Sequence, residues 1–379
     1  MKQRKDRIII IHFQPLERYP PIINLLDYLR TIAVEDIVVI STGNDTGSIF
    51  REYKSRSENV KVKRTPAIVP NSVFRIFSYL FFNASSFFFL LRYQPKSVLY
   101  FETISSWPAI MYKKLRGNKV KLLVHYHEYL NPVEYTQNMR LVRKMYKLED
   151  NLFSGHYSWI SHTNENRLNN FIKDHHLEKD NQSVFHVMPN YPSKYWAKGE
   201  TSFNSSNKIR LVYIGSLGLE TMYLKELVTW VQSHKESLSL DFYSHNVDEA
   251  AKTFLESIND GCIVLHKGCD YEQLPRILKN YDVGLVIYKP VSENWIQNAP
   301  NKVFEYLACG LDVWFSKTIT YTLSIARDDV YPKIIPVDFD NLKELNIQKA
   351  IKRDGIKLKS DDFFYENIYG EIYKNLSEG

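Results

Sequence analysis

The chain has 379 residues, too many for one compact core and suited to two domains of about 150 to 190 residues each. With 44% hydrophobic residues, 24% charged residues and a mean hydropathy of -0.34, it is neither disordered nor a single small binding module. Residues 1–200 hold 29 Lys and Arg against 18 Asp and Glu (+11), whereas residues 201–379 hold 20 against 25 (−5). The basic half favours membrane headgroups, a pyrophosphate or nucleic acid as partner; a solvated surface without a partner is the alternative.

No segment has the features of a signal peptide or of a clean membrane span. The basic N-terminus leads into a short apolar run at 8–11 without a small-residue cleavage site, so we expect a buried strand there. The most lipid-like stretch, 73–91, is interrupted by Arg, Ser and Asn residues, and no transmembrane helix is expected. The three cysteines, Cys262, Cys269 and Cys309, lack the spacing of metal ligands. We expect a cytoplasmic protein without a zinc site.

Short apolar runs alternate with amphipathic stretches, which is typical of parallel sheets covered by helices on both faces. In the first half, strands are expected at 7–12, 37–41, 97–101, 120–126, 157–161 and 184–188. Helices are expected between them, at 21–31, 72–92, 105–116, 137–153 and 163–174. A second series of strands is expected at 209–215, 239–244, 262–268, 281–288, 311–316 and 334–338.

A stretch rich in Pro, Ser, Gly and Asn at 189–207 has the composition of a linker between the two series. The sequence therefore predicts two doubly wound Rossmann-like α/β domains facing a cleft, at 1–195 and 196–358. A C-terminal helix within 359–379 has apolar residues at helical spacing and is expected to pack back on the first domain. Ligands of such sheets bind at the carboxyl ends of the strands.

One candidate phosphate site follows the first strand of the second domain. The run IRLVYIGSLG places Gly215, Ser216 and Gly218 between this strand and a helix. Glycines at such a turn let a phosphate approach backbone N–H groups at a helix N-terminus. A tight turn without a ligand is the alternative, and for this motif alone it is favoured.

A second candidate lies in the segment YDVGLVIYKPVSENWIQNAPNKVFEYLACGLDVW at 281–314. Pro300 suits the first position of a helix, and the free N–H groups after it, at Asn301 and Lys302, would face an anion. Glu305, one turn later, is suited to accept hydrogen bonds from a vicinal diol such as a ribose. A solvated amphipathic helix is the alternative.

The block A-P-N-K-V-F-E-Y-L-A-C-G, preceded by Y-D-V-G-L-V, resembles the donor-nucleotide segment of GT-B fold glycosyltransferases related to glycosyltransferase family 4. The resemblance implies a nucleotide-sugar donor of the UDP or GDP type as substrate, and no other cofactor. It implies that these residues bind the donor: Gly215, Ser216, Gly268, Pro300, Asn301, Lys302 and Glu305. YIGSLG and HVMPNYP look like the family's glycine turn and interdomain boundary.

The sequence departs from the family in three places. Asn298 stands where the family often has a second glutamate, so a carboxylate beside the donor sugar is replaced by an amide. The cations usually found after the glycine turn are missing from 217–223, and Lys225 is only a loose substitute. The family's Gly-x-Pro-Val becomes Gly-Leu-Asp-Val at 310–313, for which we have no interpretation.

In the first domain, the candidates are polar residues just past strand ends. Glu17 and Glu102 are predicted to lie on the acceptor side. His127 and Glu128, in HYHEY, look like the family's loop that faces the transferred sugar, and with Asn298 they are the predicted catalytic residues. A His and a carboxylate could act as acid and base. A satisfied surface pair is the alternative.

Basic residues of the first half recur near an aromatic-rich segment, SYLFFNASSFFFLLRY. One set is Arg140, Arg143, Lys144 and Lys147, and the other is Lys113, Lys114, Arg116, Lys119 and Lys121. A basic domain with an apolar helix could dock on an anionic membrane and reach a lipid-linked acceptor. For 79–91, a helix in the hydrophobic core is the favoured alternative.

Together these features predict a metal-independent, hexosyltransferase-like glycosyltransferase of surface polysaccharide synthesis, retaining by analogy with the family. Its acceptor would be a saccharide or a lipid-linked saccharide, its place the cytoplasm or the inner face of the membrane, and nucleic acid is not expected as a partner. The alternatives are a sugar-nucleotide epimerase or hydrolase on the same fold, and a non-catalytic partner subunit.

Overall fold

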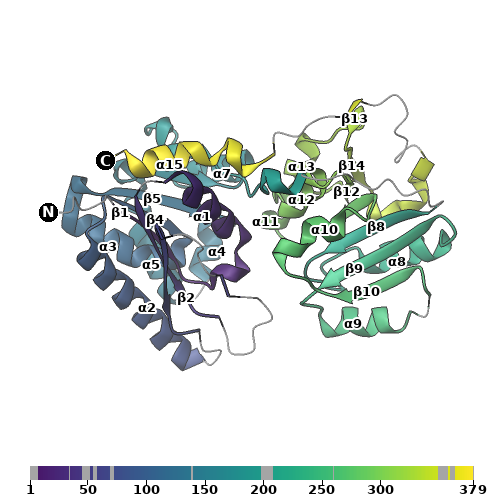
Figure 1. Ribbon diagram of the computed structural model, residues 1–379, viewed down its shortest axis with the longest axis horizontal. Coiled ribbons are helices and arrows are strands. Elements are labelled where there is room, and N and C mark those ends of the chain that lie inside the picture. The colour runs from purple at the N-terminus through teal and green to yellow at the C-terminus, as the bar shows by residue number, and fades with distance from the viewer. Residues whose placement is uncertain are drawn as a thin grey trace. The chain divides into compact units, whose positions relative to one another are not determined.

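A computed structural model of the protein divides into two compact units (Figure 1). Unit 1 comprises Met1–Pro189 and Tyr365–Gly379, and unit 2 comprises Asn190–Phe364. The boundaries predicted from the sequence fall after residues 195 and 358. The structure describes residues 7–33, 35–44, 52–53, 58–68, 72–137, 140–197, 208–258, 260–348, 357–358 and 363–378.

Unit 1 is a parallel sheet of seven strands in the order β3-β2-β1-β4-β5-β6-β7. The strands are β1 (Arg7–His12), β2 (Asp36–Thr42), β3 (Val60–Thr65), β4 (Ser97–Phe101), β5 (Lys121–Tyr126), β6 (Trp159–His162) and β7 (Phe185–Val187). Its helices are α1 (Pro20–Ile32), α2 (Ser72–Tyr93), α3 (Ser106–Arg116), α4 (Pro132–Gln137), α5 (Arg140–Asp150), α6 (Phe153–His156), α7 (Glu165–Asp174) and α15 (Tyr369–Ser377). The central strands β1 and β4 are apolar at nearly every position because both faces of the sheet are covered.

Unit 2 contains a second parallel sheet, of six strands in the order β10-β9-β8-β11-β12-β14. The strands are β8 (Ile209–Ile214), β9 (Leu238–Ser244), β10 (Ile263–Lys267), β11 (Val283–Val286), β12 (Asp312–Ser316) and β14 (Ile334–Val337), and β13 (Val330–Tyr331) pairs separately with β15 (Lys357–Leu358). Its helices are α8 (Leu224–Ser233), α9 (Glu249–Glu256), α10 (Leu274–Leu278), α11 (Glu293–Ile296), α12 (Asn301–Ala308) and α13 (Thr320–Ser324). Both sheets reverse their strand order beside the first strand, so each unit is doubly wound as predicted.

The C-terminal helix α15 belongs to unit 1 although it follows unit 2 in the sequence. Its Tyr369 and Ile372 are buried, and the hydroxyl of Tyr369 donates a hydrogen bond to the carbonyl of Pro21 at 3.4 Å. The hydroxyl of Tyr373 donates to Glu35 at 3.0 Å. The chain end is thereby fixed to the first helix and its flanking loop.

Two elements of unit 1, β3 and α4, were not predicted. β3 was missed because its alternation of Val and Lys is short and only half-buried, as befits an edge strand. The helix expected at 137–153 is present as α5, and α4 precedes it; residues 138–139 lie outside the described residues. One described helix, α2, is long and apolar enough by length and composition to cross a membrane. Over Phe74–Tyr93 its mean hydropathy is 1.4, and 28% of the most apolar window is buried.

Candidate functional site

In unit 2, the glycine turn after β8 is shaped around a lysine of α12. Gly215 has a φ of 137°, a conformation that favours glycine. A Cβ there would lie 2.7 Å from Cε of Lys302, so only glycine leaves room for this side chain. The next residue, Ser216, is exposed, and its carbonyl accepts a hydrogen bond from the Tyr213 hydroxyl at 2.9 Å. The turn and the helix start are thus brought together, as predicted.

The first turn of α12 is positioned by close packing on β11. A Cβ on Gly284 would lie 2.1 Å from the ring of Tyr306, so the glycine lets the helix approach the strand. The Tyr306 hydroxyl in turn accepts a hydrogen bond from the Ile214 N–H at 3.2 Å, which ties α12 to the end of β8. The helix begins at Asn301, so Pro300 is its N-cap, with extended ψ of 131°, and is not the first helical residue that was predicted. The N–H of Val303 donates to the carbonyl of Pro300 at 3.0 Å, whereas those of Asn301 and Lys302 have no acceptor within the helix.

Lys302 is held half-buried among aromatic rings. Its Nζ donates a hydrogen bond to the Tyr288 hydroxyl at 2.8 Å and lies 5.7 Å from the ring centroid of Tyr213. Burial disfavours the ammonium charge, but Tyr288 and Glu305 outweigh it and raise the pKa of Lys302 above its ordinary value. The side chain therefore keeps a fixed positive charge beside the glycine turn.

Glu305 lies one turn further along α12 and is only 7% exposed. Burial raises the pKa of this carboxyl to about 7, although nearby Lys302 and a hydrogen bond from Tyr271 both lower it. A carboxylate kept in this setting lacks part of the solvation that it has in water. It is therefore suited to accept hydrogen bonds from ligand hydroxyls.

Two other predicted residues lie away from this cluster or at its rim. Gly268 follows β10, the edge strand of the sheet, and its hydrogen atom faces the ring of His245, which a Cβ would approach to 2.4 Å. Asn298 is half-buried just before α12, and its N–H donates to the carbonyl of Trp295 at 3.3 Å. Their roles at the donor remain predictions.

In unit 1, histidines and a glutamate line the carboxyl edge of four neighbouring strands. His12 ends β1, Glu102 follows β4, His127 follows β5 and His162 ends β6. Burial lowers the pKa of His12 and of His162, so both imidazoles are neutral at neutral pH. Their ring nitrogens are buried and have no hydrogen-bond partner among the described residues. These two histidines were not predicted as site residues, although each stands at the end of a predicted parallel strand.

Glu102 joins the strand end of β4 to the predicted catalytic pair. Its carboxylate accepts hydrogen bonds from the N–H of His127, at 2.7 Å, and of Glu128. Burial, and then the charge of Glu128, raise the pKa of Glu102 to about 8. Glu102 also has a φ of 62°, which strains a residue other than glycine. A strained and partly desolvated carboxyl at a strand end is typical of a functional position.

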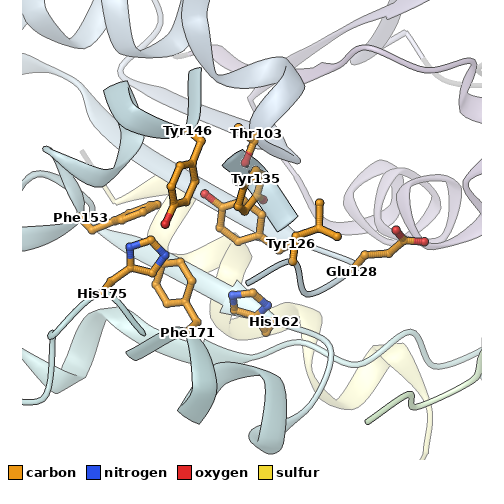
Figure 2. Close-up of a pocket in the computed structure, with 10 residues that line it drawn as sticks. Thr103, Tyr126, Glu128, Tyr135, Tyr146, Phe153, His162, Phe171 and His175 are labelled. Carbon is orange, nitrogen blue, oxygen red and sulfur yellow. Dashed lines mark hydrogen bonds between the residues drawn. The ribbon is translucent and has the colours of Figure 1, made fainter. Parts of the chain in front are cut away.

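Hydrogen bonds from a buried arginine fix the loop that carries His127. Arg167 donates from Nη1 to the carbonyl of His127 at 2.5 Å and to Thr163 at 2.8 Å. His127 is itself buried, whereas Glu128 is exposed. In Figure 2 the Glu128 carboxylate points away from the aromatic rings that line the pocket below the loop. That pocket is lined by Thr103, Tyr126, Glu128, Leu130, Tyr135, Tyr146, Phe153, His162, Phe171 and His175.

Glu17 takes part in a structural ion pair. Nη2 of Arg64 lies 2.5 Å from its Oε1, which also accepts a hydrogen bond from the N–H of Tyr53 at 2.6 Å. Its carboxylate thus ties the turn after β1 to the edge strand β3, and the acceptor role given to Glu17 stays a prediction. Among the described residues, no three His, Cys, Asp or Glu side chains form a group that could hold a metal ion.

No known family and no curated protein sequence matches this chain. Solved structures do match it over nearly the whole length. The lipopolysaccharide outer core galactosyltransferase WaaB has a TM-score of 0.59 at 11% identity, with 97% of this chain and 95% of that chain covered. HepE from Anabaena, solved with UDP, has a TM-score of 0.61 at 10% identity, with 98% and 100% covered.

The chain has the GT-B fold. This confirms, at the level of the fold, the resemblance that the segment 281–314 predicted. The GT-B fold is not confined to transferases, because UDP-GlcNAc 2-epimerase from Methanocaldococcus jannaschii also matches, with a TM-score of 0.57 at 13% identity and 98% and 100% coverage. Among the solved structures that match, WaaB is named a galactosyltransferase and one from Rickettsia africae is named a glycosyltransferase.

Proposed function

We propose that this GT-B protein is a glycosyltransferase that moves a sugar from a nucleoside diphosphate sugar to a saccharide or lipid-linked saccharide. The observation that carries the proposal is the group formed by Gly215, Lys302 and Glu305 where the strand order of unit 2 reverses. It combines a glycine turn, a fixed cation and a desolvated carboxylate, the three features that a diphosphate and a ribose require. The UDP bound to HepE and the transferase named in the WaaB structure are consistent with this choice.

In the proposed mechanism, unit 2 binds the leaving group. The bond between the sugar C1 and the diphosphate oxygen breaks, and negative charge develops on the diphosphate. Lys302 and the N–H groups at the start of α12 stabilise that charge, while Glu305 accepts hydrogen bonds from the ribose. Asn298 would donate to a sugar hydroxyl where the related enzymes use a carboxylate. No protein metal ligand takes part in this scheme.

Unit 1 is proposed to bind the acceptor at the edge formed by Glu102, His127 and Glu128. The acceptor oxygen forms the new bond to C1, and its proton leaves to the departing diphosphate or to a base. His127 and Glu128 are proposed to orient the transferred sugar, and Glu102, held by the N–H of His127, positions that loop. Retention, a hexose as the sugar and a role in surface polysaccharide synthesis follow from the family resemblance and are part of the proposal.

Two alternative functions make different predictions. An epimerase or hydrolase on this fold would convert the nucleotide sugar without any acceptor. The epimerase among the structural neighbours is the observation that favours this alternative. A non-catalytic partner subunit would bind nucleotide weakly or not at all. Asn298 and the missing cations at 217–223 are the features that favour this second alternative.

The first experiment is a thermal-shift measurement with UDP, GDP, ADP and dTDP on the wild type and on Glu305→Ala. A nucleotide at about 100 times its Kd should stabilise unit 2 by roughly 2.7 kcal/mol, or several degrees. A shift that one nucleotide causes and the variant loses supports a nucleotide-sugar enzyme. Turnover of the matching nucleotide sugar with and without a saccharide acceptor then separates a transferase from an epimerase or hydrolase. A cooperative melt that no nucleotide shifts contradicts the proposal.

A further inference from the structure

The longest described helix of unit 1, α2, exposes many large hydrophobic side chains, while its buried face includes small and polar side chains beside apolar ones. Tyr79, Phe82, Asn83, Ser86 and Leu90 form the buried face, at helical spacing. The opposite face is exposed and consists of Phe74, Ile76, Phe77, Leu80, Phe81, Ala84, Phe88 and Leu91. We refer to these eight residues as the outer face. A water-exposed helix normally has the reverse pattern, with polar residues outside.

The outer face forms a continuous apolar stripe. Phe74, Phe77, Phe81 and Phe88 are 59%, 63%, 54% and 63% exposed. With Ala84 they repeat at steps of three and four residues, so their side chains line up along the whole helix. A contiguous apolar surface of this kind marks a contact with a partner or a membrane.

The charges near the stripe indicate what kind of partner it contacts. From residue 59 to residue 127 the chain holds eleven Lys and Arg and a single acidic residue, Glu102. α3 packs beside α2, as Figure 1 shows, and because β4 connects them both helices end at the amino edge of the sheet. The cations Arg92, Lys114 and Arg116 are exposed at those ends, so a basic group lies at one end of the stripe.

A second copy of the chain is a poorer occupant of this surface than a lipid. Pairing of two copies through the stripe would bring two basic surfaces together, and α2 contains no carboxylate that could pair with a cation of the other copy. A lipid surface satisfies both features, because acyl chains accept the apolar stripe and anionic headgroups attract the basic group. The helix is not a membrane span, because Tyr79, Phe82 and Leu90 are part of the core of unit 1.

We propose that the outer face of α2 inserts into the headgroup boundary of an anionic membrane, with the cations at the ends of α2 and α3 bound to the headgroups. α2 then lies in the plane of the bilayer as an interfacial helix. Docking of this kind would hold unit 1 at the surface of an anionic membrane. The inference does not depend on the proposed enzymatic function, since it concerns a surface outside the candidate site.

The test is flotation of the full chain with vesicles of phosphatidylcholine alone and of phosphatidylcholine mixed with phosphatidylglycerol. We expect the chain to bind the mixed vesicles. Its binding to vesicles of phosphatidylcholine alone should be weaker by more than about tenfold. The triple variant Phe77→Gln, Phe81→Gln, Phe88→Gln should reduce binding roughly a hundredfold, since glutamine keeps the helix and removes the apolar area. The control is Leu323→Gln, which replaces a hydrophobic residue that is 46% exposed on unit 2 and should leave binding unchanged.

The melting temperature, and any nucleotide-induced shift, should be the same in the triple variant and the wild type, because the replaced side chains are exposed. Equal vesicle binding by the triple variant and the wild type would overturn the inference, as would a wild type that binds neither kind of vesicle. A wild type that sediments as a dimer, does not bind vesicles and becomes monomeric in the triple variant would overturn it in favour of a second copy. Failure of vesicle binding with an intact nucleotide shift would refute docking and leave the proposed function standing.

Discussion

Replacing Glu305 with glutamine should stabilise the unliganded protein and weaken nucleotide binding. Burial raises the pKa of this carboxyl from its ordinary value of 4.5 to about 7. The native state therefore binds an extra proton between these two values, and the free energy of unfolding falls as the pH rises through this window. Ionising the buried carboxyl costs about 3 kcal/mol above pH 7. Glutamine removes that cost, in which the attraction to Lys302 is already counted, but its own amide is desolvated in turn, so we expect a net gain of about 2 kcal/mol at pH 8.

Calorimetric melting of the wild type and Glu305→Gln across this pH range tests the magnitude. For a unit of this size the gain corresponds to a Tm higher by about 4 to 8 °C at pH 8, and it should disappear toward pH 4.5. The same variant should bind the cognate nucleotide more weakly by roughly tenfold to a hundredfold, because a hydrogen bond to a charged acceptor is lost. Glu249→Gln, on the exposed start of α9, is the matched control and should change neither quantity. A Tm difference that is the same at every pH would refute the electrostatic reasoning.

Three further predictions concern the packing of α12 on β11 and the two candidate sites. Gly284→Ala should destabilise unit 2 by about 3 kcal/mol in urea unfolding, because its Cβ would lie 2.1 Å from the Tyr306 ring, whereas Gly261→Ala, with no atom within 4 Å, should be neutral. Lys302→Met should weaken nucleotide binding, measured by titration calorimetry, by roughly tenfold or more, and the affinity should depend less on salt concentration. An unchanged affinity would argue against a diphosphate at this site. Glu102→Gln should make the loss of stability between about pH 5 and pH 8 shallower, because the pKa of Glu102 is raised to about 8; an identical slope in the wild type would contradict this.

The strands were the easiest part of the fold to predict from the sequence. β1, β4 and β8 are short runs of apolar residues with both faces buried, so the hydrophobic pattern alone marks them. The edge strand β3 was missed because only one of its faces is covered, and its lysines resemble a loop. Pattern also failed for α2, which is apolar almost all round: periodicity cannot tell which side of such a helix meets the sheet. Its buried side holds Asn83 and Ser86. The favoured core-helix interpretation of 79–91 holds for Phe82, which is buried, and for Phe87 and Phe89, which pack against the core, but not for the exposed Phe81 and Phe88.

The candidate site was predictable where one short segment contains it. Lys302 and Glu305 lie in one helical turn, and the link to Gly215 follows from the strand-end rule for parallel sheets. Tyr271 and Tyr288, which complete the surroundings of these two charges, come from other loops. Their contacts depend on side-chain directions that no spacing rule encodes.

The distribution of unfavourable features over the molecule also supports a function at these two edges. Burial also raises the pKa of Glu149, on α5, to about 7, but Tyr100 and Tyr126 donate hydrogen bonds to it at 2.7 and 2.9 Å. At the carboxyl edge of unit 1, Glu102 has a strained backbone conformation and a raised pKa. At the carboxyl edge of unit 2, burial raises the pKa of Glu305. A sequence selected for stability alone would replace such carboxyls with amides or apolar groups. Their presence at the positions where doubly wound sheets bind ligands indicates that the stability they cost is offset by binding, which is the property that Glu305→Gln is designed to measure.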